Sequence, residues 1–194
     1  MSYTPFSQLT LCSQDDILAE QSALPALVML EGQPFQDEAG KKIALAKEQI
    51  RQELQDYLPE IFGSTMSIYG YGAAYGYNDW LADIGYSYNQ LDAILDQIIN
   101  SEELKRTAVA YTIRLLLQDG IARYLAYNQA ESDALRTIYD FWHGTTGTRA
   151  EARHDGECFK RMAVAKRMLK FDLSLTGVLV DQDRVRTAKT IYRV

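Results

Sequence analysis

Residues 101–128 read SEELKRTAVAYTIRLLLQDGIARYLAYN and predict one long helix. Apolar side chains recur along it at the spacing of a single buried helical stripe: Leu104, Ala108, Tyr111, Leu115, Ile121 and Tyr124. Asn100 and Glu103 have the separation of a capping box, which would open the helix. Gly120 would either weaken its middle or allow another helix to approach closely. The stretch therefore favours a helical fold.

A second long helix is expected over residues 37–58. Its apolar residues also recur at three- and four-residue steps: Ile43, Ala46, Ile50, Leu54, Tyr57 and Leu58. We expect Pro59 to end this helix, because a proline disfavours the helical conformation in the residue before it.

The segment that precedes this helix is expected to be less regular. Ser13 followed by Asp16 is typical of the start of a short helix with an acidic first turn. Pro25, Gly32 and Pro34 then indicate a loop around a short apolar piece.

Further helices are expected in the second half of the chain. Residues 91–100, LDAILDQIIN, form one apolar stripe. Another helix should start near Ser132, interrupted or frayed at residues 144–147, GTTG, before it continues. The apolar positions of these two helical stretches are Leu135, Ile138, Tyr139, Trp142, Cys158, Met162, Ala165 and Leu169.

Between the two long helices, residues 63–88 alternate glycines with large aromatic side chains: Tyr69, Tyr71, Tyr75, Tyr77, Trp80, Tyr86 and Tyr88. Glycine permits unusual backbone angles, and tyrosine supplies large contact area at low entropic cost. Two interpretations stay open. The segment is either an extended loop packed on its own body or a contact with a neighbouring subunit.

Charge is distributed unevenly along the chain. Residues 149–194 carry eleven Lys or Arg against six Asp or Glu, whereas residues 1–148 carry nine against twenty. Residues 157–170 predict a cationic helix, whose basic side chains either form a solvated face or contact an acidic partner or DNA phosphates: Lys160, Arg161, Lys166, Arg167 and Lys170. Residues 171–194 predict short extended pieces around Gly177, which suit docking because an exposed strand offers unpaired backbone groups.

Together these patterns predict a mainly α protein. A helical bundle domain is expected over residues 1–170, with the Gly/Tyr-rich loop at 63–88. A short C-terminal β turn and an extended docking tail are expected over residues 171–194.

Composition narrows the function classes. The chain has 194 residues and a formal net charge of −6, so binding of nucleic acid by the whole surface is disfavoured. Its two cysteines, Cys12 and Cys158, lie far apart and favour a reduced cytosolic setting. The N-terminus lacks a charged leader, and no segment has about 18 continuous apolar residues, so we expect neither export nor a membrane span.

Motifs for chemistry are weak. His143, His154 and Cys158 match no zinc spacing, and we expect interior or surface histidines and a core cysteine. The run from Asp172 to Asp183 partly matches a calcium loop, but its alternating apolar residues favour a β turn at Thr176-Gly177. Neither a nucleophile elbow nor a phosphate loop is found. We therefore expect no metal, no cofactor and no enzymatic activity.

Taken in order, four segments resemble the head-to-tail connector (adaptor or neck) proteins of tailed bacteriophages. They are FSQLTLCSQDDILAE at 6–20, AGKKIALAKEQIRQELQDYLP at 39–59, LKRTAVAYTIRLLLQDGIARYL at 104–125 and FDLSLTGVLVDQDRVRTAKTIYRV at 171–194. The resemblance implies a helical bundle assembled as a ring in the virion neck, made in the host cytoplasm. Its partners would be the portal protein, copies of itself and a further neck or tail component, and a phosphate contact with DNA in the channel stays open.

We expect partner binding from the Gly/Tyr-rich loop and the C-terminal tail. The candidate residues are Tyr69, Tyr71, Tyr75, Tyr77, Trp80, Arg184, Arg186, Lys189, Ile191, Tyr192 and Arg193. Two alternatives stay open. One is a small DNA-packaging or regulatory factor that uses the basic helix. The other is an enzyme with its site at the Gly/Tyr-rich loop, where the polar groups are Asn78, Asp79 and Asp83.

Overall fold

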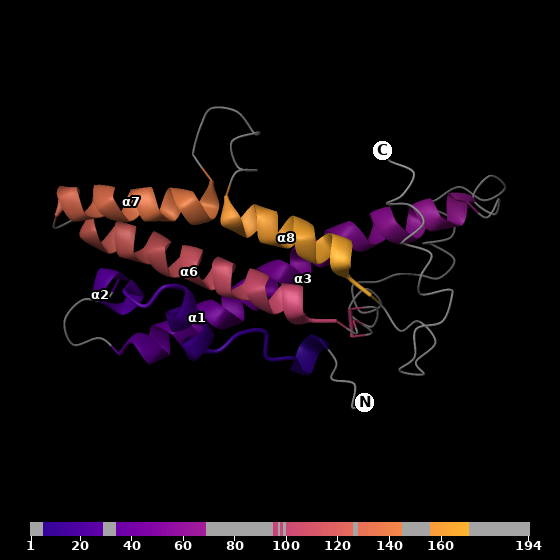
Figure 1. The fold of residues 1–194 in the computed structure, drawn as a ribbon, viewed down its shortest axis with the longest axis horizontal. Helices are drawn as coiled ribbons and strands as arrows, with labels where there is room; N and C mark the ends of the chain where they lie inside the picture. The colour runs from indigo at the N-terminus through magenta and orange to yellow at the C-terminus, as the bar shows by residue number, and fades with distance from the viewer. Residues whose placement is uncertain are drawn as a thin grey trace. The chain divides into compact units, whose positions relative to one another are not determined.

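The structure is a computed structural model that describes the parts of the chain drawn in colour in Figure 1. These are residues 6–28, 34–68, 95–96, 98, 100–125, 128–144 and 156–170, with the backbone alone for 59–68. Within these residues the chain is mainly helical and has no strand, so the predicted mainly α class is confirmed. The β turn and tail predicted for residues 171–194 lie outside the described residues.

The chain divides into two units. The larger comprises residues 10–50 and 101–167, and the smaller comprises residues 1–9, 51–100 and 168–194. This division differs from the one expected at residue 170, which stays a prediction.

The larger unit is built around helix α6, Glu102–Tyr124. The predicted stripe residues Leu104, Ala108, Tyr111 and Leu115 are buried, but so are the residues between them. The helix is buried on all sides along its middle: Thr107, Ala108, Val109, Ala110, Tyr111, Thr112, Ile113, Leu115, Leu116 and Leu117. A helix that is apolar all round belongs in the interior of a fold. The expectation of one buried stripe was therefore too narrow, and Ile121 and Tyr124 at its end are only half-buried.

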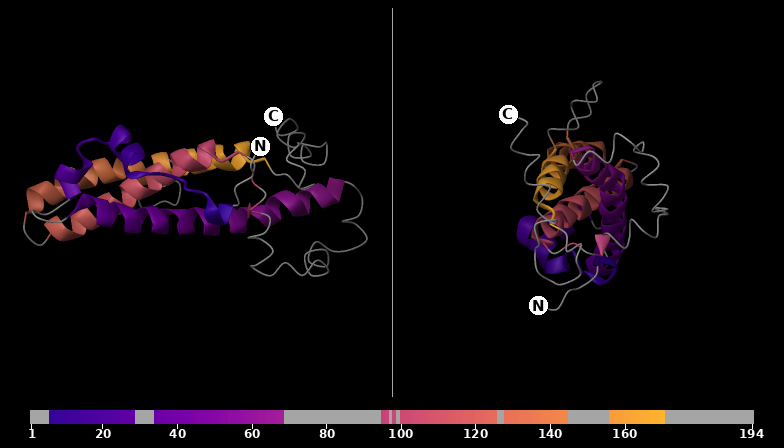
Figure 2. Two further views of the ribbon diagram at one scale, coloured as in Figure 1. Left: turned by 90° about the horizontal axis from the view of Figure 1, so that it is seen from below. Right: turned by 90° about the vertical axis from the view of Figure 1, so that its right-hand side faces the viewer.

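Neighbours contact α6 from several directions, which explains this burial. Thr112 Oγ1 lies 3.7 Å from Cys12 Sγ, just before α1, Gln14–Glu20. Arg114 donates a 2.6 Å hydrogen bond to Gln49 of α3, Phe35–Ile68. Helix α7, Gln129–His143, packs along another side of α6, and Figures 1 and 2 show these two helices side by side.

Gly120 permits the closest of these approaches. A Cβ atom at this position would lie 3.1 Å from Val28 Cγ1 and 3.4 Å from Val28 Cα. Val28 ends the short helix α2, Leu24–Val28. Of the two roles predicted for Gly120, close helix packing is the one that the structure bears out.

The N-terminus of α1 has the predicted cap. Ser13 Oγ accepts a hydrogen bond from the Asp16 backbone N–H at 3.3 Å, and Asp16 Oδ2 accepts one from the Ser13 backbone N–H at 2.7 Å. Two backbone donors that the helix itself cannot satisfy are thus paired. The Ser13 hydroxyl also donates to Asp16 Oδ2 at 2.7 Å. This hydrogen bond, followed by that of the Ser13 backbone N–H, lowers the pKa of Asp16.

This cap carries a testable prediction for stability. Ser13→Ala should lower the free energy of unfolding by about 1 kcal/mol at neutral pH. Because the pKa of Asp16 is lowered in the folded state, its stabilisation is present above the unfolded pKa and is lost as pH falls through the folded pKa. The difference between wild type and Ser13→Ala in urea unfolding should therefore shrink at acid pH. A difference that is constant with pH would contradict the role of the Asp16 carboxylate.

Contrary to the predictions from the sequence, two prolines do not interrupt helices. Pro25 lies in the first turn of α2, where its missing N–H would have no helical partner and its fixed φ suits the helix. Pro59 lies within α3, which continues to Ile68 although an interior proline removes one backbone hydrogen bond. The predictions of a loop at Pro25 and of a helix end before Pro59 were therefore wrong. Residues 63–68 belong to α3, so the first part of the predicted Gly/Tyr-rich loop is helical.

In the smaller unit, Asn100 does not cap α6. Its Nδ2 donates to the Met168 carbonyl at 2.6 Å, and its Oδ1 accepts from the Lys170 N–H at 2.8 Å. Ser101 precedes α6 and makes no side-chain capping bond. The capping box predicted from Asn100 and Glu103 was wrong, because the Asn100 amide is paired with backbone groups far away in the sequence. Leu95 and Ile98 are buried as their apolar stripe predicted. The helix expected over residues 91–100 does not extend to its predicted end, because Asp96 is in a turn and Ile98 is not helical.

The predicted interruption after Trp142 is confirmed. Helix α7 ends at His143, and Gly144 follows with φ 92°, a left-handed value that favours glycine. Helix α8, Glu157–Met168, begins next to this end. The approach is so close that a Cβ at Gly156 would overlap the backbone of His143 and Gly144. In Figure 1, α8 continues nearly in line with α7. Cys158, Met162 and Ala165 are its buried residues.

Candidate functional site

The partner-binding residues expected from the sequence lie outside the described residues. They are Tyr69, Tyr71, Tyr75, Tyr77, Trp80, Arg184, Arg186, Lys189, Ile191, Tyr192 and Arg193. His154 lies outside them too. The structure does describe the predicted cationic helix, α8, and its neighbour α7.

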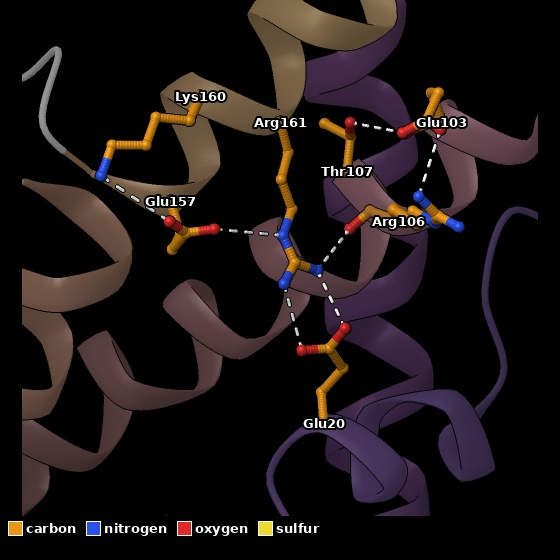
Figure 3. Close-up of polar contacts among 7 residues, drawn as sticks. All are labelled: Glu20, Glu103, Arg106, Thr107, Glu157, Lys160 and Arg161. Atoms are coloured by element: carbon orange, nitrogen blue, oxygen red, sulfur yellow. Dashed lines mark hydrogen bonds and ion pairs between the residues drawn. The ribbon is translucent and has the colours of Figure 1, made fainter.

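Arg161 of α8 is the centre of a polar network (Figure 3). Its Nη1 and Nη2 donate to the two carboxylate oxygens of Glu20, at the end of α1, both at 3.1 Å. Its Nη1 also donates to the Arg106 carbonyl of α6 at 3.3 Å. Glu157, one turn earlier on α8, lies 3.5 Å from its Nε, and its guanidinium stands 5.3 Å from the centre of the Trp142 ring.

This network joins α1, α6, α7 and α8 within the larger unit. The side chain of Arg161 is 22% exposed, and that of Glu20 is 39% exposed. Burial opposes the charge of Arg161, but its hydrogen bond and attraction to Glu20, followed by the attraction of Glu157, outweigh this and raise its pKa. A planar guanidinium suits such bidentate pairing and stacking, and a lysine would not replace it. The network holds these helices together, and the guanidinium of Arg161 is used for contacts within it.

Cys12 and Ser132 are two further buried residues in the described part of the chain. Burial raises the pKa of the Cys12 thiol, an effect that its hydrogen bond with Thr112 partly offsets. The thiol is therefore a poor nucleophile at neutral pH. The buried Ser132 Oγ has no hydrogen-bond partner, and Ser132 is a small residue on the buried face of α7. Across the described ranges, no three His, Cys, Asp or Glu side chains are grouped to hold a metal ion.

Helix α7 has an outward stripe with two carboxylates, which we call the α7 face: Asp133, Thr137, Asp140 and Phe141. Asp140 is half-buried and the other three are exposed. Arg136 lies beside this stripe, with its Nη1 3.8 Å from Asp133, in a surface ion pair that contributes little energy. These residues follow the spacing i, i+4, i+7, i+8, which covers about 100° of a helix. Leu135 and Trp142 are buried on the other side. Phe141 is 59% exposed, the largest value among the large apolar side chains of the described residues.

Helix α8 exposes a basic stripe with the same spacing, which we call the α8 face: Lys160, Val164 and Arg167. Met168, the last residue of the helix, stands at the fourth position of this pattern and is 50% exposed. Val164 is 44% exposed, and Lys160 and Arg167 are exposed. Lys160 Nζ lies 3.7 Å from Glu157, a surface ion pair that contributes little energy.

The sequence indicated the cationic helix but not its division into two sides. Arg161 belongs to the internal network, whereas Lys160 and Arg167 lie on the outer face. Helical spacing from the buried Cys158 and Met162 could have separated these sides. The bidentate pairing with Glu20 could not be foreseen, because the two residues are 141 positions apart.

No match was found when the chain was compared with family models, with curated proteins and with solved structures. In the part of the chain that is described, none of the helices has the length and apolar character needed to cross a membrane.

Proposed function

We propose that the protein is a structural subunit of the neck of a tailed bacteriophage. Copies of it would form a ring that joins the portal to the tail or to the next neck protein. Its function would be in assembly rather than catalysis, and it would be located in the virion.

The observation that carries this proposal is the position of residues 104–125 in the larger unit. This segment is one of those that resemble the connector proteins, and it forms α6, the helix around which the unit packs. A helical bundle is the fold that the resemblance implies. A second resembling segment, residues 6–20, includes α1 and supplies Glu20 to the Arg161 network. Within the larger unit, residues 10–20 and 104–125 of the resembling segments thus pack together.

A small DNA-packaging or regulatory factor is the second candidate, because Lys160 and Arg167 lie exposed on α8. Arg161 does not add to that surface, since Glu20 and Glu157 neutralise it. Asp133 and Asp140 on α7 would repel DNA phosphates. The exposed charges of α7 and α8 therefore favour a protein partner over DNA.

Co-sedimentation separates these two functions. Purified protein would be mixed with its cognate portal protein or with duplex DNA, in a series of salt concentrations. The neck proposal predicts co-sedimentation with the portal and weak binding to DNA. DNA binding that falls steeply with salt, without any binding to the portal, would replace the neck proposal with the DNA-factor one.

A further inference from the structure

The outer faces of α7 and α8 match in spacing and are opposite in charge. Asp133 and Asp140 are seven residues apart on the α7 face, and Lys160 and Arg167 are seven residues apart on the α8 face. At 1.5 Å rise per residue, each pair of charges is separated by about 10.5 Å along its helix. Two such helices laid against each other can therefore form two ion pairs at once.

Apolar side chains accompany the charges on both faces. Phe141 stands beside Asp140 on α7, and Val164 lies between Lys160 and Arg167 on α8. Asp133 and Asp140 outnumber Arg136 on α7, and Lys160 and Arg167 outnumber Glu157 on α8, so the net charges of the two faces are opposite. A face that combines exposed apolar groups with a net charge suits a partner that combines apolar groups with the opposite net charge. Each of the two faces has the composition that the other requires.

Within one chain, the α7 face and the α8 face cannot contact each other. The end of α7 and the start of α8 are in contact at Gly144 and Gly156, and the helices follow one another nearly in line (Figure 1). Helices arranged end to end do not lie side by side. The complementary faces can therefore meet only between two copies of the chain.

We infer that the α7 face of one copy docks on the α8 face of a second copy. The inference rests on the proposed function, since it names the contact by which copies would assemble. The contact joins two different faces, so each copy has one face left for a further neighbour. Repeated contacts of this kind generate a ring when the rotation between copies closes. Duplex DNA fits the pair of faces less well, because it would attract α8 and repel α7.

Reversing the charges on one face at a time tests this contact. Asp133→Lys with Asp140→Lys makes both faces basic, and Lys160→Glu with Arg167→Glu makes both faces acidic. Each double variant alone should self-associate at least about tenfold more weakly than wild type, because like charges now face each other. A mixture of the two double variants should regain association, because each offers a face that the other complements.

A matched control changes the same charge elsewhere. Lys41→Glu with Lys105→Glu alters net charge as Lys160→Glu with Arg167→Glu does, at two exposed lysines in surface ion pairs. This control should associate as wild type does. Analytical ultracentrifugation would measure association, with and without the cognate portal, and circular dichroism would check that each variant melts as wild type does.

The outcomes separate the contact from the proposed ring. Weak association of each double variant with recovery in the mixture supports the contact. Assembly of wild type and both variants alike would overturn the contact and leave the neck proposal standing. A discrete pair of copies that responds to the same substitutions would keep the contact and overturn the ring. Wild type that stays monomeric, alone and with the portal, would overturn both.

Discussion

Replacing Ile113 by alanine should lower the free energy of unfolding of the larger unit by about 2–5 kcal/mol. Ile113 is fully buried in the middle of α6. Truncation removes three apolar carbon atoms from a site with neighbours on every side. The loss therefore includes both the transfer of those atoms and the cavity that remains, since helices held around α6 cannot all move inward.

The matched control for this substitution is Leu125→Ala. Leu125 directly follows α6 and is 49% exposed, so its truncation should change stability by no more than about 0.5 kcal/mol. Urea unfolding followed by circular dichroism would measure both variants. Equal losses for Ile113→Ala and Leu125→Ala would show that α6 is not the core of the unit.

Replacing Arg161 by alanine should cost about 2 kcal/mol of unfolding free energy. The substitution removes the bidentate partner of Glu20, the donor to the Arg106 carbonyl and the cation beside Trp142. A fully buried pair would lose more, about 3–5 kcal/mol, when one partner is removed. Glu20 is 39% exposed, so water can solvate it once Arg161 is gone, and the smaller value is expected.

Lys160→Ala provides the control on the same helix. Its ammonium lies 3.7 Å from Glu157 and its side chain is 56% exposed, so the loss should stay within about 0.5 kcal/mol. A double-mutant cycle between Arg161→Ala and Glu20→Ala would isolate their interaction. A coupling energy near zero would show that the network of Figure 3 does not hold α1 to α8.

Local patterns in the sequence predicted local structure well. The Ser13 and Asp16 cap, the interruption after Trp142 and the buried face of α8 each depend on a few neighbouring residues, and each is confirmed. Local rules failed where distant residues compete for the same group. Asn100 has the spacing of a cap, but its amide pairs with backbone groups at residues 168 and 170.

The apolar spacing of a helix also did not reveal which other elements pack around it. The spacing in α6 identified Leu104 and Leu115 as buried, yet it did not reveal that Thr107 and Thr112 are buried too. Their hydroxyls donate to the carbonyls of Glu103 and Ala108 within the helix, which allows polar residues inside the core. The two faces on α7 and α8 could be derived only once the buried side of each helix was known.

The mass of the particle formed with the cognate portal tests the proposed ring most directly. Mass photometry of the portal before and after addition of the protein would give the number of copies bound. If copies form a ring on the portal, one discrete, heavier species that contains several copies of the chain is expected, seen as a closed ring by electron microscopy. A portal whose mass does not change, or a protein that binds it as separate single copies, would contradict the proposed ring.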